Sequence, residues 1–202
     1  MYVLKRRFNY LMVRDISQII ILIEQDEWMM EILKTAQSLQ LPDWWICAGF
    51  VRTKIWDTLS ENSDRTPLDD IDVVYFDPTD LKEETEKEFE KVLQLLLPHV
   101  PWSVKNEARM HTVNGASPYT STEDAISKFP ETATALGVTI TDQGKVLLTA
   151  PWGVGDVMSF KVKPTPYFRE NKKIASIYEE RIRKKSWKTN WPKVTFEHIE
   201  VD

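Results

Sequence analysis

Two aspartates stand two residues apart where an apolar segment begins. Asp70 and Asp72 flank Ile71, and Val73 follows them. On a strand, both carboxylates would project from one face while Ile71 and Val73 enter the core on the other. Paired carboxylates repel each other unless cations lie between them. Their hard oxygens suit magnesium, which can align attacking and leaving oxygens for phosphoryl or nucleotidyl transfer. The competing interpretation is a strand that starts in solvent with acidic residues capping it.

A candidate phosphate-binding turn lies one helix and one loop upstream of this pair. Residues 44–48 are short and bulky, as in a buried strand, and the apolar residues of 51–59 return to helical spacing. Backbone N–H groups at a helix start, beside a glycine that lets a ligand approach closely, can hold phosphate. Ala48, Gly49 and Arg52 occupy that turn, and Arg52 adds a charged donor. Together the turn and the aspartate pair supply both halves of a nucleotide site.

Other polar side chains are candidates to join such a site. Residues 102–110 have the pattern of a strand, on which Arg109 and His111 would share one face and contact phosphate or the acceptor. A solvated strand end explains these two residues equally well. Cys47 has apolar neighbours, so we expect a buried structural thiol rather than a nucleophile. Three further candidates to line the pocket, which helix capping would also explain, are Glu131, Thr132 and Thr134.

The apolar residues along the chain alternate between helical and strand spacing. Helices are predicted at 15–40 (one or two), 51–59, 81–96 and 171–185. Strands are predicted at 44–48, 71–76 and 102–110, with a hairpin over 138–148. This alternation predicts an α/β fold with a mixed central sheet.

The composition describes a folded globular protein. The chain has 202 residues, 42% of them hydrophobic and 28% charged, and its eight tryptophans supply large apolar side chains. Disordered and fibrous classes are therefore excluded. The net charge of -5 offers nucleic acid no broad positive field, so any contact with nucleic acid must be local.

The sequence predicts a cytoplasmic protein. Its single cysteine, Cys47, cannot form an intramolecular disulfide. The apolar run 19–23 is too short to span a bilayer, and no small-residue cleavage site follows it. We therefore expect neither a secretion signal nor a membrane anchor.

The two motifs together resemble those of a known superfamily. Ala48-Gly49-Phe50-Val51-Arg52 followed by Asp70-Ile71-Asp72 is similar to the DNA polymerase β-like nucleotidyltransferases, whose signature is a Gly-Gly or Gly-Ser turn followed by Asp-hydrophobic-Asp. The Val51-Arg52 extension looks most like the head domain of tRNA CCA-adding enzymes. Residues 41–163 and 187–192 resemble more closely a small family of single-domain bacterial nucleotidyltransferase-like proteins of unidentified substrate. The strings that carry this closer resemblance are Leu41-Pro42-Asp43-Trp44-Trp45, Asp69 to Asp77, Trp102 to Asn106, Ala108-Arg109-Met110-His111 and Pro130 to Ala135.

The resemblance implies roles for two further positions. In the superfamily, a third acidic residue on a neighbouring strand completes the metal site and helps to activate the acceptor hydroxyl. Glu107 is the only acid within 102–110 and is the candidate for that role. Ala48 stands where the superfamily has the first glycine of its turn, and it is tolerated if that position only closes the turn.

We therefore expect a nucleotidyltransferase-type mixed central sheet flanked by helices. An N-terminal helical segment, 1–40, would pack on a core of 41–168, followed by a basic C-terminal helix and tail, 169–202. The expected activity is magnesium-dependent transfer of a nucleoside monophosphate from an NTP to an unidentified acceptor hydroxyl, with release of pyrophosphate. Asp70 and Asp72 would hold two magnesium ions, Glu107 would join them in catalysis, and Ala48, Gly49, Arg52 and Arg109 would bind the nucleotide. The alternative is an inactive nucleotide-binding or partner-binding domain of the same fold.

The basic C-terminal stretch bears on the identity of the acceptor. Lysines and arginines gather after Arg169, with Trp187 and Trp191 among them. Such a tail could grip an RNA acceptor by phosphate contacts and stacking. The alternative is a helix with a solvated charged face and tryptophans packed on the domain. Because the chain is acidic overall, we expect a small-molecule acceptor rather than RNA. If the domain still folds, truncation after Pro166 should leave nucleotide binding largely intact.

Overall fold

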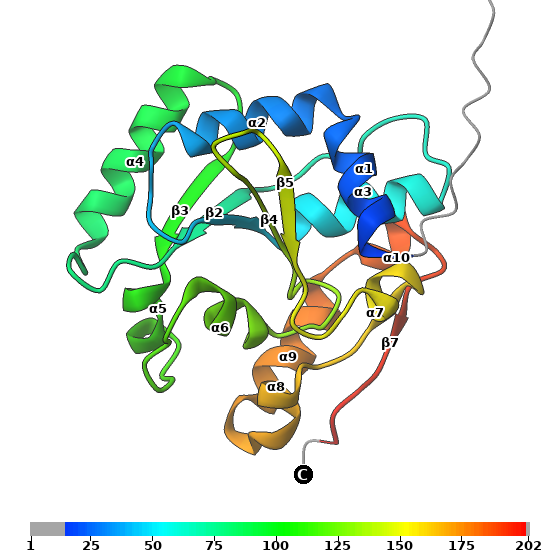
Figure 1. Cartoon of the computed structure of the whole chain (residues 1–202). Coiled ribbons are helices and arrows are strands. Elements are labelled where there is room, and N and C mark those ends of the chain that lie inside the picture. The colour runs from blue at the N-terminus through cyan, green and yellow to red at the C-terminus, as the bar shows by residue number, and fades with distance from the viewer. Residues whose placement is uncertain (1–14, 201–202) are drawn as a thin grey trace, which may run out of the picture.

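A five-stranded mixed sheet lies at the centre of the computed structural model, which describes residues 15–200 (Figure 1). The strand order is β3-β2-β1-β4-β5, with β2 and β3 parallel and the other neighbours antiparallel. The strands are β1 (Trp45–Cys47), β2 (Ile71–Tyr75), β3 (Trp102–Asn106), β4 (Gly137–Ile140) and β5 (Val146–Thr149). The expected α/β fold with a mixed central sheet is confirmed.

Helices cover both faces of this sheet. In Figure 1, α1 (Ile16–Glu24), α2 (Glu27–Gln37) and α4 (Glu83–Leu96) lie above it, whereas α5 (Glu107–Val113) and α6 (Thr122–Ser127) lie below. α3 (Gly49–Leu59) starts directly after β1. The side chains of β2 therefore alternate between the two faces of the sheet. Ile71 and Val73 are fully buried in the main core on the upper face, while Val74 packs with Cys47 and Ile126 on the lower face. Asp72 therefore belongs to the lower face.

The predicted N-terminal helical region is two helices, broken where a second capping residue occurs. The side chains of Asp15 and Asp26 accept hydrogen bonds from the backbone N–H groups of Gln18 and Met29, and so cap α1 and α2. Ile19 and Ile23 are fully buried in the main core. Residues 1–14 of the expected 1–40 segment lie outside the described residues. Within residues 15–200, no helix has the length and apolar character that a membrane crossing requires.

The strand predicted for 102–110 is wrong in its second half. β3 ends at Asn106, whose side chain accepts the backbone N–H of Ala108 and caps α5. Arg109 and His111 therefore lie on a helix and not on a strand face beside Asp70. The guanidinium of Arg109 donates to both oxygens of the buried Glu86 carboxylate at 2.8 Å, so the structure places Arg109 outside the expected nucleotide site.

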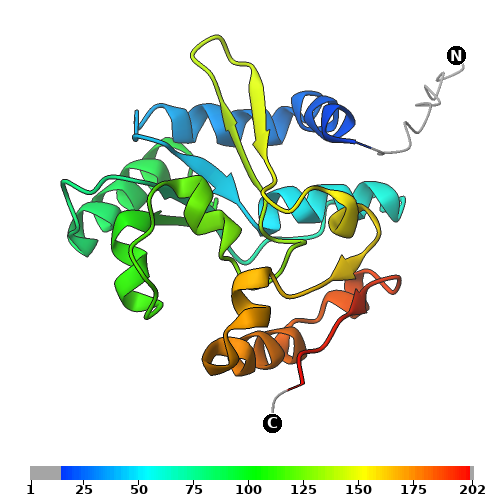
Figure 2. The same cartoon turned by 60° about the horizontal axis from the view of Figure 1, so that its bottom comes forward.

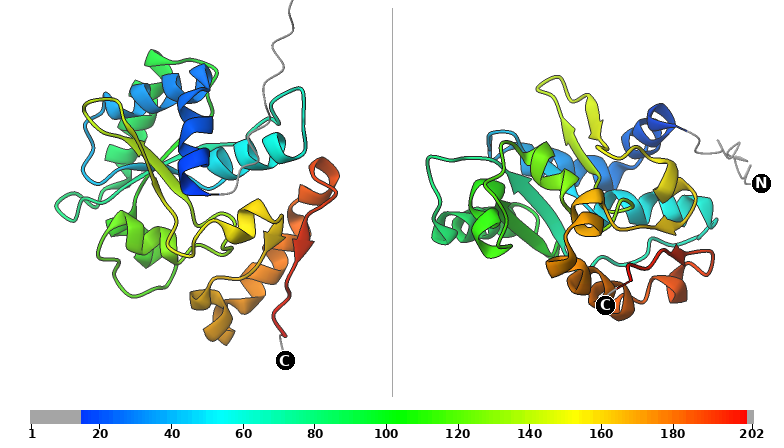
Figure 3. Two further views of the ribbon diagram at one scale, coloured as in Figure 1. Left: turned by 45° about the vertical axis from the view of Figure 1, so that its right-hand side comes forward. Right: turned by 90° about the horizontal axis from the view of Figure 1, so that it is seen from below.

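The C-terminal part of the chain packs on the domain. It contains α7 (Gly155–Met158), α8 (Pro166–Glu170), α9 (Lys172–Lys184) and α10 (Trp187–Asn190), with the short parallel pair β6 (Lys161–Val162) and β7 (Thr195–Phe196). Figures 2 and 3 show α9 and the last segment, in orange and red, along the side of the molecule that also holds α3 and α7.

Tryptophans fix this segment to α3. The rings of Trp187 and Trp191 meet the ring of Trp56 edge-on at 5.9 and 5.0 Å, and all three are buried. The indole N–H of Trp191 donates to the buried Asp57 at 2.9 Å. Truncation after Pro166 would strip Trp56 of this packing and remove one wall of the pocket described below, so the structure argues against the condition on that prediction, that the domain still folds.

Candidate active site

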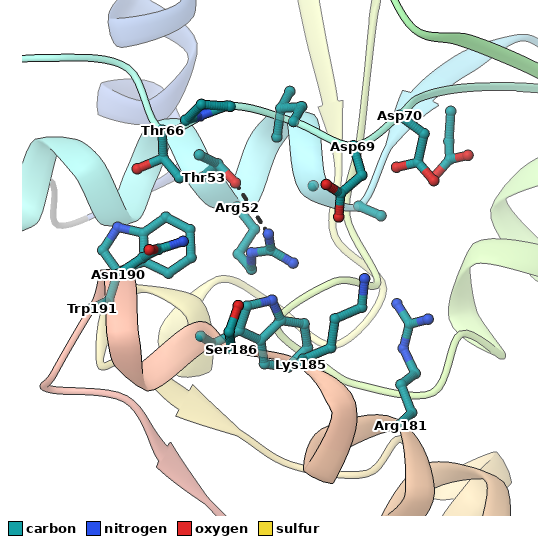
Figure 4. A pocket seen from close by; sticks show the side chains of 16 residues that line it. Arg52, Thr53, Thr66, Asp69, Asp70, Arg181, Lys185, Ser186, Asn190 and Trp191 are labelled. Carbon is teal, nitrogen blue, oxygen red and sulfur yellow. Dashed lines mark hydrogen bonds between the residues drawn. The ribbon is translucent and has the colours of Figure 1, made fainter.

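A pocket of about 210 Å³ lies between the start of α3, the loop 66–72 and residues 181–191 (Figure 4). Ala48, Gly49, Arg52 and the Asp70–Asp72 pair all line it. The structure therefore brings together the two motifs that the sequence separates by a helix and a loop. The opposite wall comes from α9 and α10, which are more than a hundred positions further along the chain.

The aspartate pair forms the acidic side of the pocket. Asp70 is exposed just before β2, and Asp72 is half-buried within it. Burial and the neighbouring charge of Asp70 raise the pKa of Asp72 to about 6, against the opposing effects of a hydrogen bond with Ser103 and the charge of Arg181. Neither aspartate forms an ion pair with any residue in the described part of the chain. Two unneutralised carboxylates at the start of one strand are the hard oxygen donors that Mg²⁺ prefers, so these residues fit the metal.

The turn from β1 into α3 has an unusual backbone at Ala48. Its φ is 52° and its ψ is -111°, a conformation that favours glycine because a Cβ crowds the backbone there. The Ala48 N–H donates to Leu136 of the neighbouring strand segment, which holds the turn in place. The alanine is therefore tolerated at a cost in strain.

We expect Ala48→Gly to stabilise the fold. Strain at such a position costs about 1–3 kcal/mol, and glycine adds about 0.4–1 kcal/mol of unfolded-chain entropy, so a net gain of about 1 kcal/mol should remain. Thermal melting should show a midpoint higher by about 2–4 °C. The control Ala116→Gly, at a residue without positive φ, should lower the midpoint instead. Equal destabilisation by both substitutions would contradict the strain at Ala48.

Gly49 leaves room for a ligand that its protein neighbours do not need. A Cβ built at this position would meet Leu68 Cδ2 at 3.5 Å and Arg52 Nη2 at 3.8 Å, which are ordinary contacts. The side-chain space beside Gly49 opens into the pocket. Packing within this chain therefore does not require a glycine at the start of α3, and we expect the free space to serve close approach of a ligand.

We predict that Gly49→Ala separates folding from nucleotide binding. Alanine is a better helix former, so stability should stay level or rise by up to about 1 kcal/mol. NTP affinity should fall at least about tenfold, because the methyl group occupies the approach to the helix start. Titration with NTP and a thermal melt measure the two effects. Gly155→Ala, at the first residue of α7 and with open space around its Cβ, is the matched control and should leave NTP affinity unchanged. Unchanged NTP affinity in Gly49→Ala would show that the turn before α3 does not bind the nucleotide.

Arg52 provides a buried cation at the back of the pocket. Its guanidinium lies over the rings of Trp56, Trp187 and Trp191 at 5.2, 4.8 and 5.6 Å. Nη2 donates to Thr53 Oγ1 at 3.1 Å, and Nε is buried without a hydrogen-bond partner. Burial lowers the pKa of Arg52 to about 10, so the group remains charged at neutral pH. A fixed cation with an unused donor is suited to an anionic ligand.

Two further cations face the pocket from the C-terminal wall. Arg181 and Lys185 line it, and Figure 4 shows both side chains directed toward the loop that carries Asp69 and Asp70. Arg181 Nε donates to the fully buried Glu131 at 2.6 Å, which fixes the guanidinium in place. Glu131, expected as a pocket-lining residue, thus acts by positioning Arg181. The pocket is cationic on one side and acidic on the other.

Asp57 fastens the two walls to each other. Its carboxylate accepts hydrogen bonds from the backbone N–H and the hydroxyl of Thr66, at 2.8 and 2.7 Å, and from Trp191. Thr66 begins the loop that carries the aspartate pair, and Trp191 ends the C-terminal wall. Nothing in the local sequence around Asp57 indicates this role, because both partners come from other elements.

Glu107 does not line the pocket that holds the aspartate pair. It is only 5% exposed and heads α5, and it makes no hydrogen bond or ion pair within residues 15–200. Burial, together with the charges of Asp72 and Glu86, raises its pKa to about 8. No group of three or more His, Cys, Asp or Glu side chains among the described residues could hold one metal ion, so Glu107 does not complete a three-carboxylate cluster. Cys47 is a buried free thiol, as expected, and burial raises its pKa.

Comparisons with known proteins agree with the fold. A family model described as nucleotidyltransferase matches residues 34–196. A structure described as an NMR structure that reveals a CCA-adding enzyme head domain is 36% identical, with a TM-score of 0.82, over 90% of this chain and 95% of that one.

Two CCA-adding enzyme structures share the fold at much lower identity. The complex with CTP has a TM-score of 0.53 at 13% identity, and apo form I has 0.50 at 16%. Each comparison covers 92% of this chain but only 44% and 43% of the enzymes, so the chain spans less than half their length. No curated protein matches the sequence significantly.

Proposed function

The chain belongs to the nucleotidyltransferase family, and from that premise we propose that it transfers a nucleoside monophosphate from an NTP to an acceptor hydroxyl in a magnesium-dependent reaction. The observation that supports this most is the pocket with an aspartate pair on one side and Arg52, Arg181 and Lys185 on the other. A triphosphate with its metal has the complementary distribution of charge.

Each side of the pocket would take one part of the substrate. Arg52, the N–H groups at the start of α3 and the cations of α9 would bind the β- and γ-phosphates. Asp70 and Asp72 would hold two Mg²⁺ ions, which, when bound, neutralise charge on the phosphates and on the attacking oxygen. The acceptor oxygen would form a bond to the α-phosphorus as the bond to the bridging oxygen breaks, and pyrophosphate would leave. The proton of the acceptor hydroxyl would pass to solvent or to a carboxylate.

Labelled nucleotide tests this activity without knowledge of the acceptor. The protein would be incubated with each α-³²P-labelled NTP, Mg²⁺ and cell extract, and label would be followed into small molecules, RNA and protein. The proposal predicts transferred label and pyrophosphate release that both require Mg²⁺. Nucleotide binding without transfer to any acceptor would instead favour an inactive nucleotide-binding domain, the alternative that the absence of Glu107 from the pocket lining supports.

We also propose a small-molecule acceptor in preference to RNA. Arg181 and Lys185 are turned into the pocket, while Lys184 and Arg169 pair with Glu180 and Glu197 on the outside. The net charge of -5 offers the phosphates of a long nucleic acid no broad positive field. RNA binding should therefore be weak and salt-sensitive.

A gel shift with total tRNA measures this directly. We expect weak retention at low salt and none near physiological ionic strength, since each released counterion weakens binding as salt rises. Sub-micromolar binding that survives physiological salt would overturn the preference for a small acceptor.

A further inference from the structure

A second cavity, of about 330 Å³, lies under the lower face of the sheet. α5 and the end of α6 form one side of it, and α8 and α9 form the other (Figure 1). Its lining is mostly apolar and includes four rings, those of Tyr119, Phe129, Tyr167 and Phe168. Val113 and Ile177 at its edge are 62% and 51% exposed, unusually high for large apolar side chains. An apolar hollow with exposed hydrophobic edges is typical of a small-molecule site.

Glu107 is the one acidic side chain that lines this cavity. Its side chain is only 5% exposed, yet no hydrogen bond or ion pair within residues 15–200 involves its carboxyl group. Its carboxyl oxygens are not among the fully buried unpartnered atoms of the described residues, so they remain accessible from the cavity that Glu107 lines. Lys128, the lining cation, is already bonded to Asp124. The cavity therefore holds an unused acidic group inside an aromatic wall.

The cavity and the nucleotide pocket share one element, α9. Along α9, Ile174 and Ile177 line the cavity, and Arg181 lines the nucleotide pocket at the next helical repeat of the same face. Asp72 on β2 lies near enough to Glu107 for its charge to raise the pKa of that residue. A ligand in the cavity would thus lie one turn of α9 away from a cation of the nucleotide pocket.

We propose that this cavity binds the acceptor, and that the acceptor is a small molecule with an apolar body and an ammonium group that pairs with Glu107. The assignment of the bound molecule as the acceptor rests on the proposed transferase activity. The preference of the cavity for an amine does not depend on that activity. The aromatic rings and the carboxylate both favour a cation over a neutral or anionic head group. The apolar body would occupy the space between α5 and α9, and a hydroxyl elsewhere on the molecule would extend toward Asp72.

Fragment binding tests the recognition chemistry without nucleotide or metal. The probes are 2-phenylethylamine, 2-phenylethanol and phenylacetate, which share a body and differ in charge. NMR titration of the full chain at about pH 8.5, where Glu107 is largely ionised and the amine keeps its charge, should show the amine binding on the order of tenfold more tightly than the alcohol. The anion should bind weakest. Equal affinity for the three probes, or no binding of the amine, would overturn the proposal.

Two variants assign the binding to this cavity. Glu107→Gln removes the charge with little change in shape, so this variant should bind the amine and the alcohol with about equal affinity. Ile177→Arg places a bulky cation at the exposed edge and should abolish amine binding, whereas Ile16→Arg, at a comparably exposed isoleucine of α1, should leave it unchanged. Amine binding that survives Ile177→Arg and keeps its preference in Glu107→Gln would refute the assignment.

The transfer assay separates this inference from the proposed function. Ile177→Arg should bind NTP like the wild type yet lose at least about 90% of label transfer in cell extract. Full transfer by this variant would show that the acceptor binds elsewhere. If the wild type itself transfers no label, the proposed function fails, while the fragment titrations still decide whether the cavity recognises an amine.

Discussion

Replacing Asp72 by Asn should inactivate the protein and stabilise it at the same time. The aspartate lies beside Asp70 in a partly dehydrated site, and its pKa of about 6 is above the ordinary value of 3.8. The folded state therefore binds the proton more tightly than the unfolded state does. That contribution to stability is fully present below about pH 4 and is lost as the pH rises through 6, so the ionised carboxylate opposes folding at neutral pH.

The size of the stabilisation follows from the shift. A change of about two pKa units corresponds to at most about 3 kcal/mol, and partial exposure reduces this to about 1–3 kcal/mol. Thermal melting of Asp72→Asn in EDTA at pH 7.5 should show a midpoint raised by about 3–8 °C. The same comparison at pH 4 should show a smaller difference, because the wild-type carboxyl is then mostly protonated.

The functional loss should be large. The proposed mechanism assigns metal binding to both carboxylates, so label transfer by Asp72→Asn should drop by roughly 10²–10⁴, within the range typical for loss of an essential catalytic group. Asp142→Asn, at an exposed aspartate in the β4–β5 turn, should change neither property. A destabilised variant that keeps Mg²⁺-dependent transfer would contradict both parts of this prediction.

Arg52→Met should cost nucleotide affinity without cost to the fold. The guanidinium is buried, lacks a partner for Nε and stacks on three tryptophans, so methionine can fill the same space without a charge. Replacement of a poorly compensated buried charge by an apolar side chain is often neutral or stabilising. Loss of charge-assisted contacts to phosphate in a desolvated pocket should lower NTP affinity by roughly 10²-fold.

Two related variants sharpen this result. Arg52→Lys keeps the charge but loses the planar fork, and its affinity should fall between those of wild type and Arg52→Met. Arg65→Met removes a guanidinium stacked on Trp28 at 4.1 Å outside the pocket and should leave NTP affinity unchanged. NTP titration with Mg²⁺, beside a thermal melt, measures all three. An Arg52→Met protein that is folded and binds NTP within twofold of the wild type would exclude Arg52 from phosphate binding.

The two motifs were predictable because their geometry is local. Alternation along Ile71–Tyr75 is enough to place Asp72 away from the core, and the change of spacing at Gly49 is enough to place a helix start beside a strand end. Contact between these motifs then follows from the pairing of β1 with β2. The structure confirms both strands and the helix between them.

The error at β3 has a local cause that the apolar pattern conceals. Buried and less buried side chains alternate along residues 102–106, as in a strand. The apolar Met110 extends this strand-like pattern in the sequence. Asn106 stops the strand because its side chain accepts the N–H of Ala108 and starts a helix. The buried Glu86 and the half-buried Glu90 accept the outward N–H groups of Asn106 and Val104, so α4 closes this sheet edge in place of another strand.

The cationic wall could not be predicted from spacing alone. Arg181 and Lys185 belong to a basic helix, and composition does not reveal which of its faces packs on the domain. The sequence does indicate that Ile174, Ile177 and Arg181 share one face of this helix, because they follow helical spacing. Only the packing of Trp187 and Trp191 on Trp56 turns that face toward the aspartate pair.

Titration of the full-length protein with each NTP, in Mg²⁺ and again in EDTA, tests the central claim most directly. A site with carboxylates on one side and cations on the other predicts binding of at least one NTP that weakens by tenfold or more without the metal, and that pyrophosphate competes away. Absence of binding by all four NTPs, or equal affinity with and without Mg²⁺, would contradict the assignment of this pocket.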